Sequence, residues 1–411
     1  MLRILHAAEA AAQPIPYYVS LNYDDLFKIQ RVHNAFPLKP VSFSSLATYL
    51  ECPGCALDQR RKKRSKEPKH FTHVHQDTLF LQKQPDPRLV GTLLHQIINL
   101  LHDSHGVLSE EQRSTLLTSP DMLTSFVQHD LLQVLQSIEK LKMAMFFDEL
   151  SINGRLLQTL IISPLLRYQR ELALNGSTVF AISERFQFKL ASTRKTFTGH
   201  TDWGGDVALV GEFDQIRLRN VDDVLTPEGI PAIFEFKMGL GKKKSWDKLS
   251  SALDDNPIST SSDELTQPGI GHAFQLAIYW MAFQTRWDLL EHVMLARGRG
   301  EDVRMQFEQD LDLILYNLRD GNQYQLLFVD RPRALQALTN CIFHLNWAMK
   351  SGYAWQVPEH ECGKTHLLED VPQQAIQVGY RAISAQECYL LAREAFHIFK
   401  EMIYWRKIPA R

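Results

Sequence analysis

The sequence predicts an α/β protein, with a mixed β-sheet core flanked by helices and with helical N- and C-terminal elaborations. Apolar residues recur every four positions at Leu89, Leu93, Ile97 and Leu101, which indicates a helix. Between 182 and 190 they alternate with polar residues, which indicates a strand. The expected order of helices, strands, helix, strands and helices is typical of a mixed sheet with helices packed on it.

Composition excludes several classes of protein. The 411 residues are 45% hydrophobic and 22% charged, unlike a wholly disordered, collagen-like or disulfide-scaffold chain. The formal net charge of −2 excludes a globally basic nucleic-acid binder, although a locally basic surface stays open. Five cysteines, an odd number, favour a reducing compartment. Without a secretory leader or an apolar run near ~18 residues, we expect a cytoplasmic protein with no membrane partner.

The elements divide the chain into four expected regions. These are an N-terminal segment with a basic linker, a helical region, a core of strands and a C-terminal helical region, at 1–87, 88–180, 181–310 and 311–411. Within the core we expect three strands and a helix, at 182–190, 206–218, 231–237 and 272–287. Between the third strand and the helix, a stretch rich in Ser, Asp, Pro and Gly predicts a loop insertion. The runs VMLAR and DVRMQFEQ, within 293–309, predict a hairpin after the helix.

The expected strand PAIFEFK carries two opposite charges. Side chains alternate along a strand, so Ile233, Glu235 and Lys237 share one face, with the charged residues ~6–7 Å apart. Apolar residues on both faces predict a mostly buried strand. Burying a carboxylate and an ammonium is costly unless they pair with each other or bind something. A structural ion pair is one interpretation, and a binding site is the other.

A second carboxylate is expected on the preceding strand. The run VALVGEFDQIRL places Val210, Asp214, Ile216 and Leu218 on one face, so Asp214 lies among apolar residues. If the two strands are neighbours, Asp214 and Glu235 can converge. Two hard oxygen ligands beside a lysine suit Mg²⁺ or Mn²⁺. A cation there could polarise a phosphodiester and generate hydroxide, while the lysine orients the attacking water.

Five short motifs follow one another in a defined order along the chain. Their residues are Ser42, Ser44, Tyr49, Cys52 and Pro53; Gly91 and His95; Gly211, Asp214 and Ile216; Glu235, Lys237 and Gly239; and Gln275 and Tyr279. The patterns are S-x-S…Y…CP, G-x-x-x-H, G-x-x-D-x-I, (D/E)-x-K-x-G and Q-x-x-x-Y. This order resembles the PD-(D/E)XK nuclease superfamily, specifically its RecB-like branch, which includes the AddB nucleases and the CRISPR-associated exonucleases. The resemblance covers residues 42–300.

The resemblance implies a restriction-endonuclease-like fold and a set of site residues. The metal ligands that it implies are His95, Asp214, Glu235 and the backbone carbonyl of Phe236, around Mg²⁺ or Mn²⁺. The residue at the position of Lys237 is catalytic in the family. Those at the positions of Gln275 and Tyr279 help to position the active site or the DNA.

The resemblance also implies a function, a Mg²⁺- or Mn²⁺-dependent deoxyribonuclease acting on single- or double-stranded DNA. An exonuclease in DNA repair, recombination or defence would fit, with a helicase or another repair or defence subunit as partner. The chain has no G-x-x-x-x-G-K-[ST] phosphate loop, so it carries no evident motor of its own. The alternative is a catalytically idle DNA-binding or assembly subunit on the same fold. The presence of all the ligands and of Lys237 favours the enzyme.

Other charged residues are weaker candidates. Glu184 opens the strand that carries Phe186 and Phe188, and it is a candidate for a supporting catalytic role; the alternative is a carboxylate at the solvated end of the strand. Lys242, Lys243 and Lys244 follow the (D/E)-x-K-x-G turn and are expected to contact DNA phosphates. The run RRKKR at 60–64 is a second candidate for such contacts. Solvated charge is the alternative for both basic runs.

The cysteines depart from the family pattern. Many RecB-like relatives hold an iron–sulfur cluster with one Cys from the opening segment and three from a C-terminal C-x-x-C…C group. Cys52 fits the first position, but Cys341, Cys362 and Cys388 form no C-x-x-C, so an iron–sulfur cluster is not expected. Buried thiols are the interpretation that the sequence favours. The alternative is a zinc site, formed by Cys52, Cys55, Cys362 and His366.

Overall fold

The structure is a computed structural model. It describes residues 27–31, 41–54, 56, 85–104, 106–175, 177–192, 207–219, 229–239, 268–286, 288–291, 311–350, 376–378, 381–383 and 385–409. The basic run at 60–64, the expected hairpin within 293–309 and part of the candidate site residues lie outside these ranges. Those site residues are Cys55, Lys242, Lys243, Lys244, Cys362 and His366. Their roles stay predictions from the sequence.

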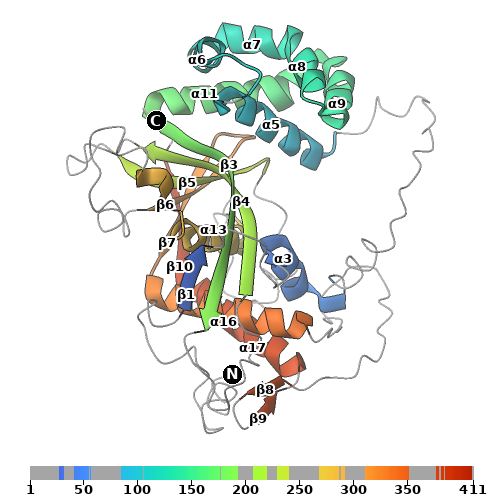
Figure 1. The fold of residues 1–411 in the computed structure, drawn as a ribbon. Coiled ribbons are helices and arrows are strands. Elements are labelled where there is room, and N and C mark those ends of the chain that lie inside the picture. Colours follow the sequence, from blue (N-terminus) through green and yellow to red (C-terminus); the bar gives the residue numbers. More distant parts are fainter. Residues whose placement is uncertain are drawn as a thin grey trace, which may run out of the picture.

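One mixed sheet of eight strands forms the centre of the molecule (Figure 1). The strand order is β1-β3-β4-β5-β6-β7-β10, and the short β2 pairs with β4 beside this path. The pairs β2–β4 and β5–β6 are parallel, and the other pairs are antiparallel. The strands are β1 (Phe27–Arg31), β2 (Val41–Ser42), β3 (Thr178–Ser192), β4 (Val207–Arg219), β5 (Ile230–Lys237), β6 (Asp312–Asn317), β7 (Gln323–Phe328) and β10 (Ile403–Ile408). A separate hairpin joins β8 (Ile376–Val378) to β9 (Arg381–Ile383).

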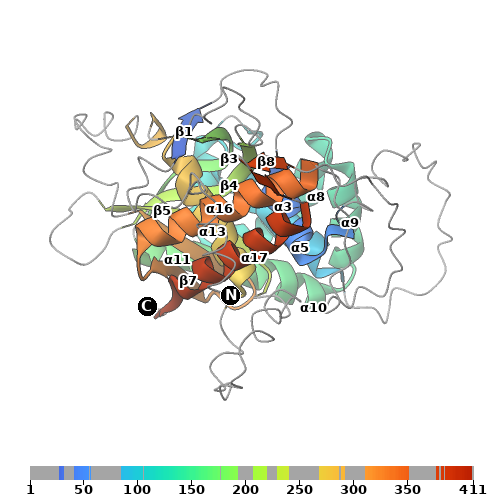
Figure 2. The same ribbon diagram turned by 90° about the horizontal axis from the view of Figure 1, so that it is seen from below.

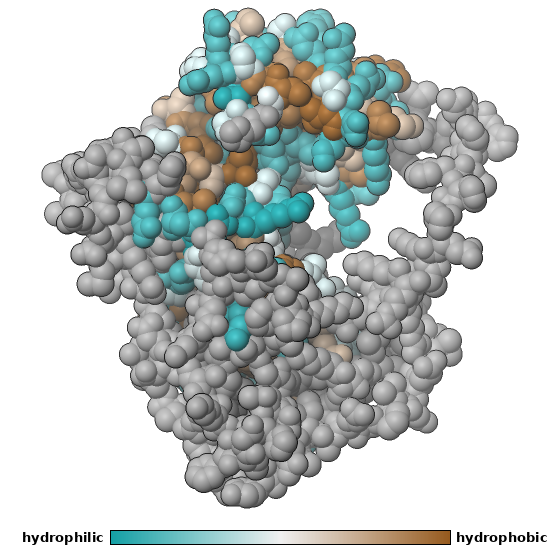
Figure 3. Space-filling view, viewed as in Figure 1, coloured by the Kyte–Doolittle hydropathy of each residue, from teal (hydrophilic) through white to brown (hydrophobic). Residues whose placement is uncertain are grey.

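Helices from the first half of the chain form a layer over one face of the sheet (Figure 1). They are α5 (Pro87–His102), α6 (Glu110–Thr118), α7 (Pro120–His129), α8 (Leu131–Ser137), α9 (Leu141–Ser151), α10 (Gly154–Leu157), the π-helical turn η1 (Gln158–Ile162) and α11 (Ser163–Asn175). The expected stripe on α5 is confirmed, because Leu93, Ile97 and Leu101 are buried. On the outer side of the layer, polar and apolar side chains both reach the surface (Figure 3), and Leu141 and Met145 are exposed.

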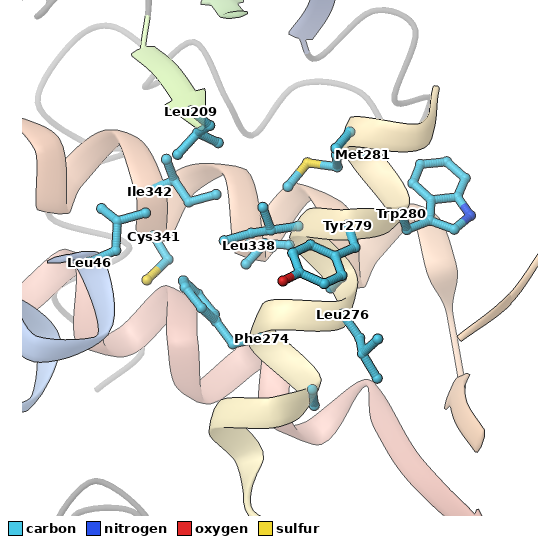
Figure 4. Packing of buried hydrophobic residues seen from close by; sticks show 14 of the residues in the cluster. Leu46, Leu209, Phe274, Leu276, Tyr279, Trp280, Met281, Leu338, Cys341 and Ile342 are labelled. Carbon is cyan, nitrogen blue, oxygen red and sulfur yellow. The ribbon is translucent and has the colours of Figure 1, made fainter. Parts of the chain in front are cut away.

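The opposite face of the sheet carries a second group of helices (Figures 1 and 2). They are α3 (Phe43–Glu51), α13 (Ile270–Phe283), α16 (Arg331–Lys350) and α17 (Ala385–Glu401). Apolar side chains bury α13 on nearly all sides, as Figure 4 shows for Phe274 and Tyr279 beside Leu338 of α16. A helix that is apolar all around belongs to the core. A polar side chain on α13, such as Gln275, therefore needs its hydrogen-bond partners inside the protein.

The α/β class is confirmed, and the C-terminal region differs from the prediction. The sequence predicts a helical region from 311, but β6, β7 and β10 belong to the same sheet as β5. The apolar runs that form β6 and β7 are six residues long, too short for their periodicity to distinguish strand from helix. The helix expected at 272–287 ends at Phe283. No helix within the described ranges is long and apolar enough to cross a membrane.

The alternation of side chains in β3 and β4 slips by one position at the same level of the sheet. In β3, Phe186 packs on the α13 side, whereas Ile182 packs on the α5 side. In β4, Phe213 and Ile216 are three residues apart, a spacing that would place them on opposite faces of a regular strand, and yet both pack on the α13 side. The predicted single faces of the two strands are therefore wrong, because regular alternation does not hold through this level. Asp214 lies between the two parts of β4.

Candidate active site

The candidate site lies where β4 separates from β5, a point that we call the fork. The antiparallel ladder between the strands runs from Arg219↔Ile230 to Gln215↔Phe234 and ends there. The N–H of Phe236 instead donates to Oδ2 of Asp214, at 2.8 Å. The Asp214 side chain thus takes the place of a backbone partner, while β5 stays paired with β6 as far as Lys237. The expectation that Asp214 and Glu235 lie on neighbouring strands is confirmed.

Helix α5 brings His95 to the fork from the helical layer. Its Nδ1 lies 3.4 Å from Oδ1 of Asp214, and its Nε2 donates to the carbonyl oxygen of Phe236 at 3.1 Å. Gly91, one turn earlier, permits this close approach, because a Cβ there would lie 3.3 Å from Cγ of Met238. The motif G-x-x-x-H therefore has a packing explanation. Its glycine lets the helix lie against the end of β5, and its histidine reaches the strand.

Residues of β5 and α13 surround the second carboxylate. Glu235 is only 2% exposed, and its Oε1 accepts hydrogen bonds from Nζ of Lys237 and from Nε2 of Gln275, the latter at 2.8 Å. Nε2 of Gln275 also donates to the hydroxyl of Tyr279, at 2.7 Å. This arrangement gives the polar residues of the buried helix α13 their partners. The other carboxylate oxygen, Oε2 of Glu235, is buried, and no described residue forms a hydrogen bond with it.

The two carboxylates differ in their readiness to ionise. Burial, together with repulsion from Asp214, raises the pKa of Glu235 to about 7. Burial also acts to raise the pKa of Asp214, but His95 and Lys237 outweigh it, and this pKa lies below its ordinary value. Burial disfavours the charged forms of His95 and Lys237, yet the carboxylates beside them raise both pKa values. Divergent pKa values among neighbouring groups are typical of catalytic groups and of cation sites.

The donor set fits a hard divalent cation. No three His, Cys, Asp or Glu side chains in the described part of the chain are gathered as a ready-made metal-binding group. At the fork the polar groups pair with one another instead. Their chemistry nevertheless suits Mg²⁺ or Mn²⁺, since it combines two carboxylates, a backbone carbonyl and an imidazole. The observation that argues for the fit is Oε2 of Glu235, because a buried carboxylate oxygen without a partner is costly.

The structure brings together most of the predicted site residues that it describes. His95, Asp214, Glu235, Phe236, Lys237, Gln275 and Tyr279 are linked by the contacts above, and we call them the candidate site. Glu184 is separate from it, because its carboxylate pairs with Arg286 at 2.7 Å. That salt bridge is structural in character, since Arg286 is buried and also donates to the carbonyl of Arg185. The prediction of a supporting catalytic role for Glu184 gains nothing from this position.

The described cysteines lie in the core. Cys52, Cys341 and Cys388 are all buried. Burial raises the pKa of Cys388 to about 12 and raises that of Cys341 further, so both are protonated thiols at neutral pH. Of the four residues of the expected zinc site, only Cys52 lies within the described ranges. The thiols therefore act as core residues where the structure describes them.

Two residues of the site's surroundings were not predicted. Asn99 lies on α5 one turn after His95, and its Nδ2 donates to the hydroxyl of Ser183. Ser183 itself has a φ of 47° in the middle of β3. The spacing of Asn99 and His95 could have identified the first, because residues i and i+4 share a helix face. A left-handed serine inside a strand has no signature in the sequence.

Comparisons with known proteins add no family. The chain matches no protein-family model, no curated protein and no solved structure. The resemblance to the RecB-like nucleases therefore stays a prediction from the five motifs. The geometry of the candidate site is the observation that bears on function.

Proposed function

We propose that the protein is a metal-dependent nuclease that hydrolyses phosphodiester bonds, with DNA as its substrate. The observation that carries this proposal is the meeting of Asp214, Glu235, Lys237 and His95 at the fork, with one buried carboxylate oxygen lacking a hydrogen bond. Two carboxylates with a lysine suit an Mg²⁺- or Mn²⁺-assisted attack on a phosphate. An exonuclease of the RecB-like kind, working in repair or defence with a helicase or another subunit, is the form that the motifs favour.

The topology around the site supports a restriction-endonuclease-like fold. The strands β3, β4 and β5 are consecutive and antiparallel, and α13 then leads to β6, which pairs in parallel with β5. The carboxylates come from β4 and β5, and the supporting Gln275 and Tyr279 come from α13. The site thus lies on strands and a helix that pack on both of their sides, which supports a precise catalytic geometry.

Six residues of the candidate site have defined tasks in this proposal. Asp214, Glu235, the Phe236 carbonyl and His95 would hold the cation, which when bound supplies polarisation of the phosphate and a lowered pKa for water. The ammonium group of Lys237 orients the attacking water and offsets negative charge that develops on the phosphate. Gln275 fixes Oε1 of Glu235 through a hydrogen bond, which leaves Oε2 to face the cation.

The test is a cleavage assay on end-labelled single-stranded DNA, double-stranded DNA and RNA, with Mg²⁺, Mn²⁺ or EDTA. We expect cleavage of DNA with either ion and none with EDTA. Lys237→Ala should bind Mn²⁺ in calorimetry as the wild type does but lose turnover, because its charge matters most in the transition state. Lys407→Ala, an exposed lysine on β10, is the matched control and should cleave normally.

Two outcomes would count against the proposal. Cleavage by Lys237→Ala at the wild-type rate would make Lys237 a structural residue. DNA binding by the wild type without cleavage under either ion would favour the catalytically idle DNA-binding or assembly subunit instead.

A further inference from the structure

We propose that Ser183 and Asn99 are positioning residues of the candidate site, an inference that rests on the proposed function. Ser183 sets the direction of Asp214, and Asn99 holds α5, and with it His95, against the sheet. Neither residue belongs to any of the five motifs. Both act through other side chains.

The backbone of Ser183 is unusual for the interior of a strand. Its φ of 47° lies in the left-handed region, which residues other than Gly, Asn and Asp rarely occupy. The other non-glycine residue with positive φ in the described ranges is Glu139, which lies in the turn between α8 and α9. A left-handed residue suits a turn. One inside a strand of 15 residues persists only because its surroundings hold it there.

Ser183 faces Asp214 across the ladder between β3 and β4. The pairs on either side are Ile182↔Gln215 and Glu184↔Phe213. The side-chain alternation of both strands slips at this level, so the left-handed residue and the slip coincide. As a result, Asp214 does not join either apolar face. Its side chain instead reaches across to β5, where Oδ2 accepts the N–H of Phe236.

Asn99 links helix α5 to β3 at the position where the side-chain alternation slips. Its Nδ2 donates to the hydroxyl of Ser183, a contact between α5 and β3. Because Asn99 lies four residues after His95, both project from one face of α5. The contact therefore holds the face that presents His95. Loss of it would let the imidazole shift relative to Asp214 and to the Phe236 carbonyl, which it now approaches at 3.4 Å and 3.1 Å.

Three variants separate the contribution of the Asn99–Ser183 hydrogen bond from that of the left-handed Ser183 backbone. Asn99→Ala removes the donor. Ser183→Gly removes the hydroxyl but tolerates the left-handed backbone, whereas Ser183→Thr keeps a hydroxyl and disfavours that backbone through its branched Cβ. The matched control is Asn153→Ala, which removes a side-chain hydrogen bond at the start of α10, where Oδ1 of Asn153 accepts from the N–H of Leu156.

The experiment measures four quantities in each variant: Mn²⁺ affinity by calorimetry, cleavage of a labelled oligonucleotide, the imidazole NMR signals of His95, and the thermal unfolding midpoint. The His95 signals are assigned with a His95→Gln variant. We expect Mn²⁺ affinity to fall roughly 10–100-fold in all three variants, and turnover at a fixed Mn²⁺ concentration to fall with it, as is usual for residues that orient ligands. The His95 signals should move in Asn99→Ala and in Ser183→Gly. The midpoint of Ser183→Gly should fall no further than that of Asn153→Ala, which should keep normal affinity and turnover.

The outcomes distinguish this inference from the proposed function. If Asn99→Ala and Ser183→Gly keep the wild-type His95 signals and Mn²⁺ affinity, the positioning role is overturned, whatever the protein cleaves. If the wild type neither binds Mn²⁺ nor cleaves nucleic acid, the proposed function fails. In that case the His95 signals alone decide whether Asn99 and Ser183 position the imidazole.

Discussion

Strand β4 carries two polar clusters three residues apart, one around Asp214 and one around Arg217. The first is the candidate site. The second, which we call the Arg217 network, consists of His102, Tyr168, Glu171, Gln215 and Arg217. In it, Nη1 of Arg217 donates to Glu171 at 2.6 Å, and the guanidinium lies 3.9 Å from the ring centroid of Phe234. Gln215 donates to the Tyr168 hydroxyl, which lies 2.7 Å from Nε2 of His102.

The clusters differ in access and in charge. The side chain of Arg217 is 0% exposed, whereas those of His95 and Lys237 keep 30% and 29% exposure. The Arg217 network balances one cation against one carboxylate. The candidate site instead holds two carboxylates close enough for one to raise the pKa of the other. A closed and balanced cluster supports the fold, while an accessible cluster with crowded carboxylates is what the proposed function requires.

The largest expected effect follows from removing a carboxylate of the candidate site. Asp214→Ala should lower metal-dependent cleavage by ~10²–10⁴ in rate, because one hard ligand is lost. The free energy of unfolding should change little, because the relief of repulsion with Glu235 is offset by the loss of the hydrogen bond to the Phe236 N–H and of the contact with His95. Cleavage rates and urea unfolding measure the two effects. Glu212→Ala, an exposed carboxylate two residues earlier on β4, is the control, and full activity in Asp214→Ala would contradict the assignment.

The converse is expected in the Arg217 network. Arg217→Ala should lower the free energy of unfolding by about 3–5 kcal/mol, because Glu171 is left as a buried charge without its cation. The double variant Arg217→Met/Glu171→Leu should recover most of this loss, since no charge then stays buried. Urea unfolding of the wild type, the single variant and the double variant measures the free energy of unfolding of each. A small loss in the single variant would mean that the network is less closed than its contacts indicate.

A smaller effect tests the packing behind the candidate site. Gly211 has no room for a side chain, because a Cβ there would overlap the ring of Phe186, whose centroid lies 5.5 Å from that of Tyr279. Gly211→Ala should therefore cost about 1–3 kcal/mol in unfolding free energy. Adding Phe186→Leu should restore part of it. Gly154→Ala, where a Cβ meets nothing within 4 Å, should not destabilise the protein.

The last effect, which is absent at neutral pH, is a pH dependence that belongs to the Arg217 network. Burial, with repulsion from Arg217, lowers the pKa of His102 to about 3 from an ordinary value of 6.5. The unfolded chain therefore binds a proton between pH 6.5 and about 3 that the folded protein does not, and stability falls as the pH falls through this window. In His102→Gln the fall should be smaller. Thermal unfolding from pH 7 to 4 measures the difference, with the exposed His129→Gln as a control that should match the wild type.

Much of the candidate site could be predicted because its motifs are local. The i, i+4 spacing of Gly91 and His95, and that of Gln275 and Tyr279, places each pair on one face of a helix whatever the rest of the fold does. Likewise, the buried strand with Glu235 and Lys237 follows from its own run of apolar residues. The order of helices and strands, and hence the α/β class, depends on the same short-range periodicity.

The tertiary structure decided what depends on residues far apart in the sequence. Strand β4 leaves β5 at Gln215, which creates the fork, and the slip in side-chain alternation beside it coincides with the left-handed Ser183, a conformation that no local pattern indicates. Strands β6, β7 and β10 belong to the sheet because they pair with other strands and bury their apolar side chains there. Their sequences are too short to predict this pairing. Local sequence determined which residues are candidates for the site. Long-range pairing determined the direction in which Asp214 and His95 point, because side-chain direction in a sheet follows from register and twist.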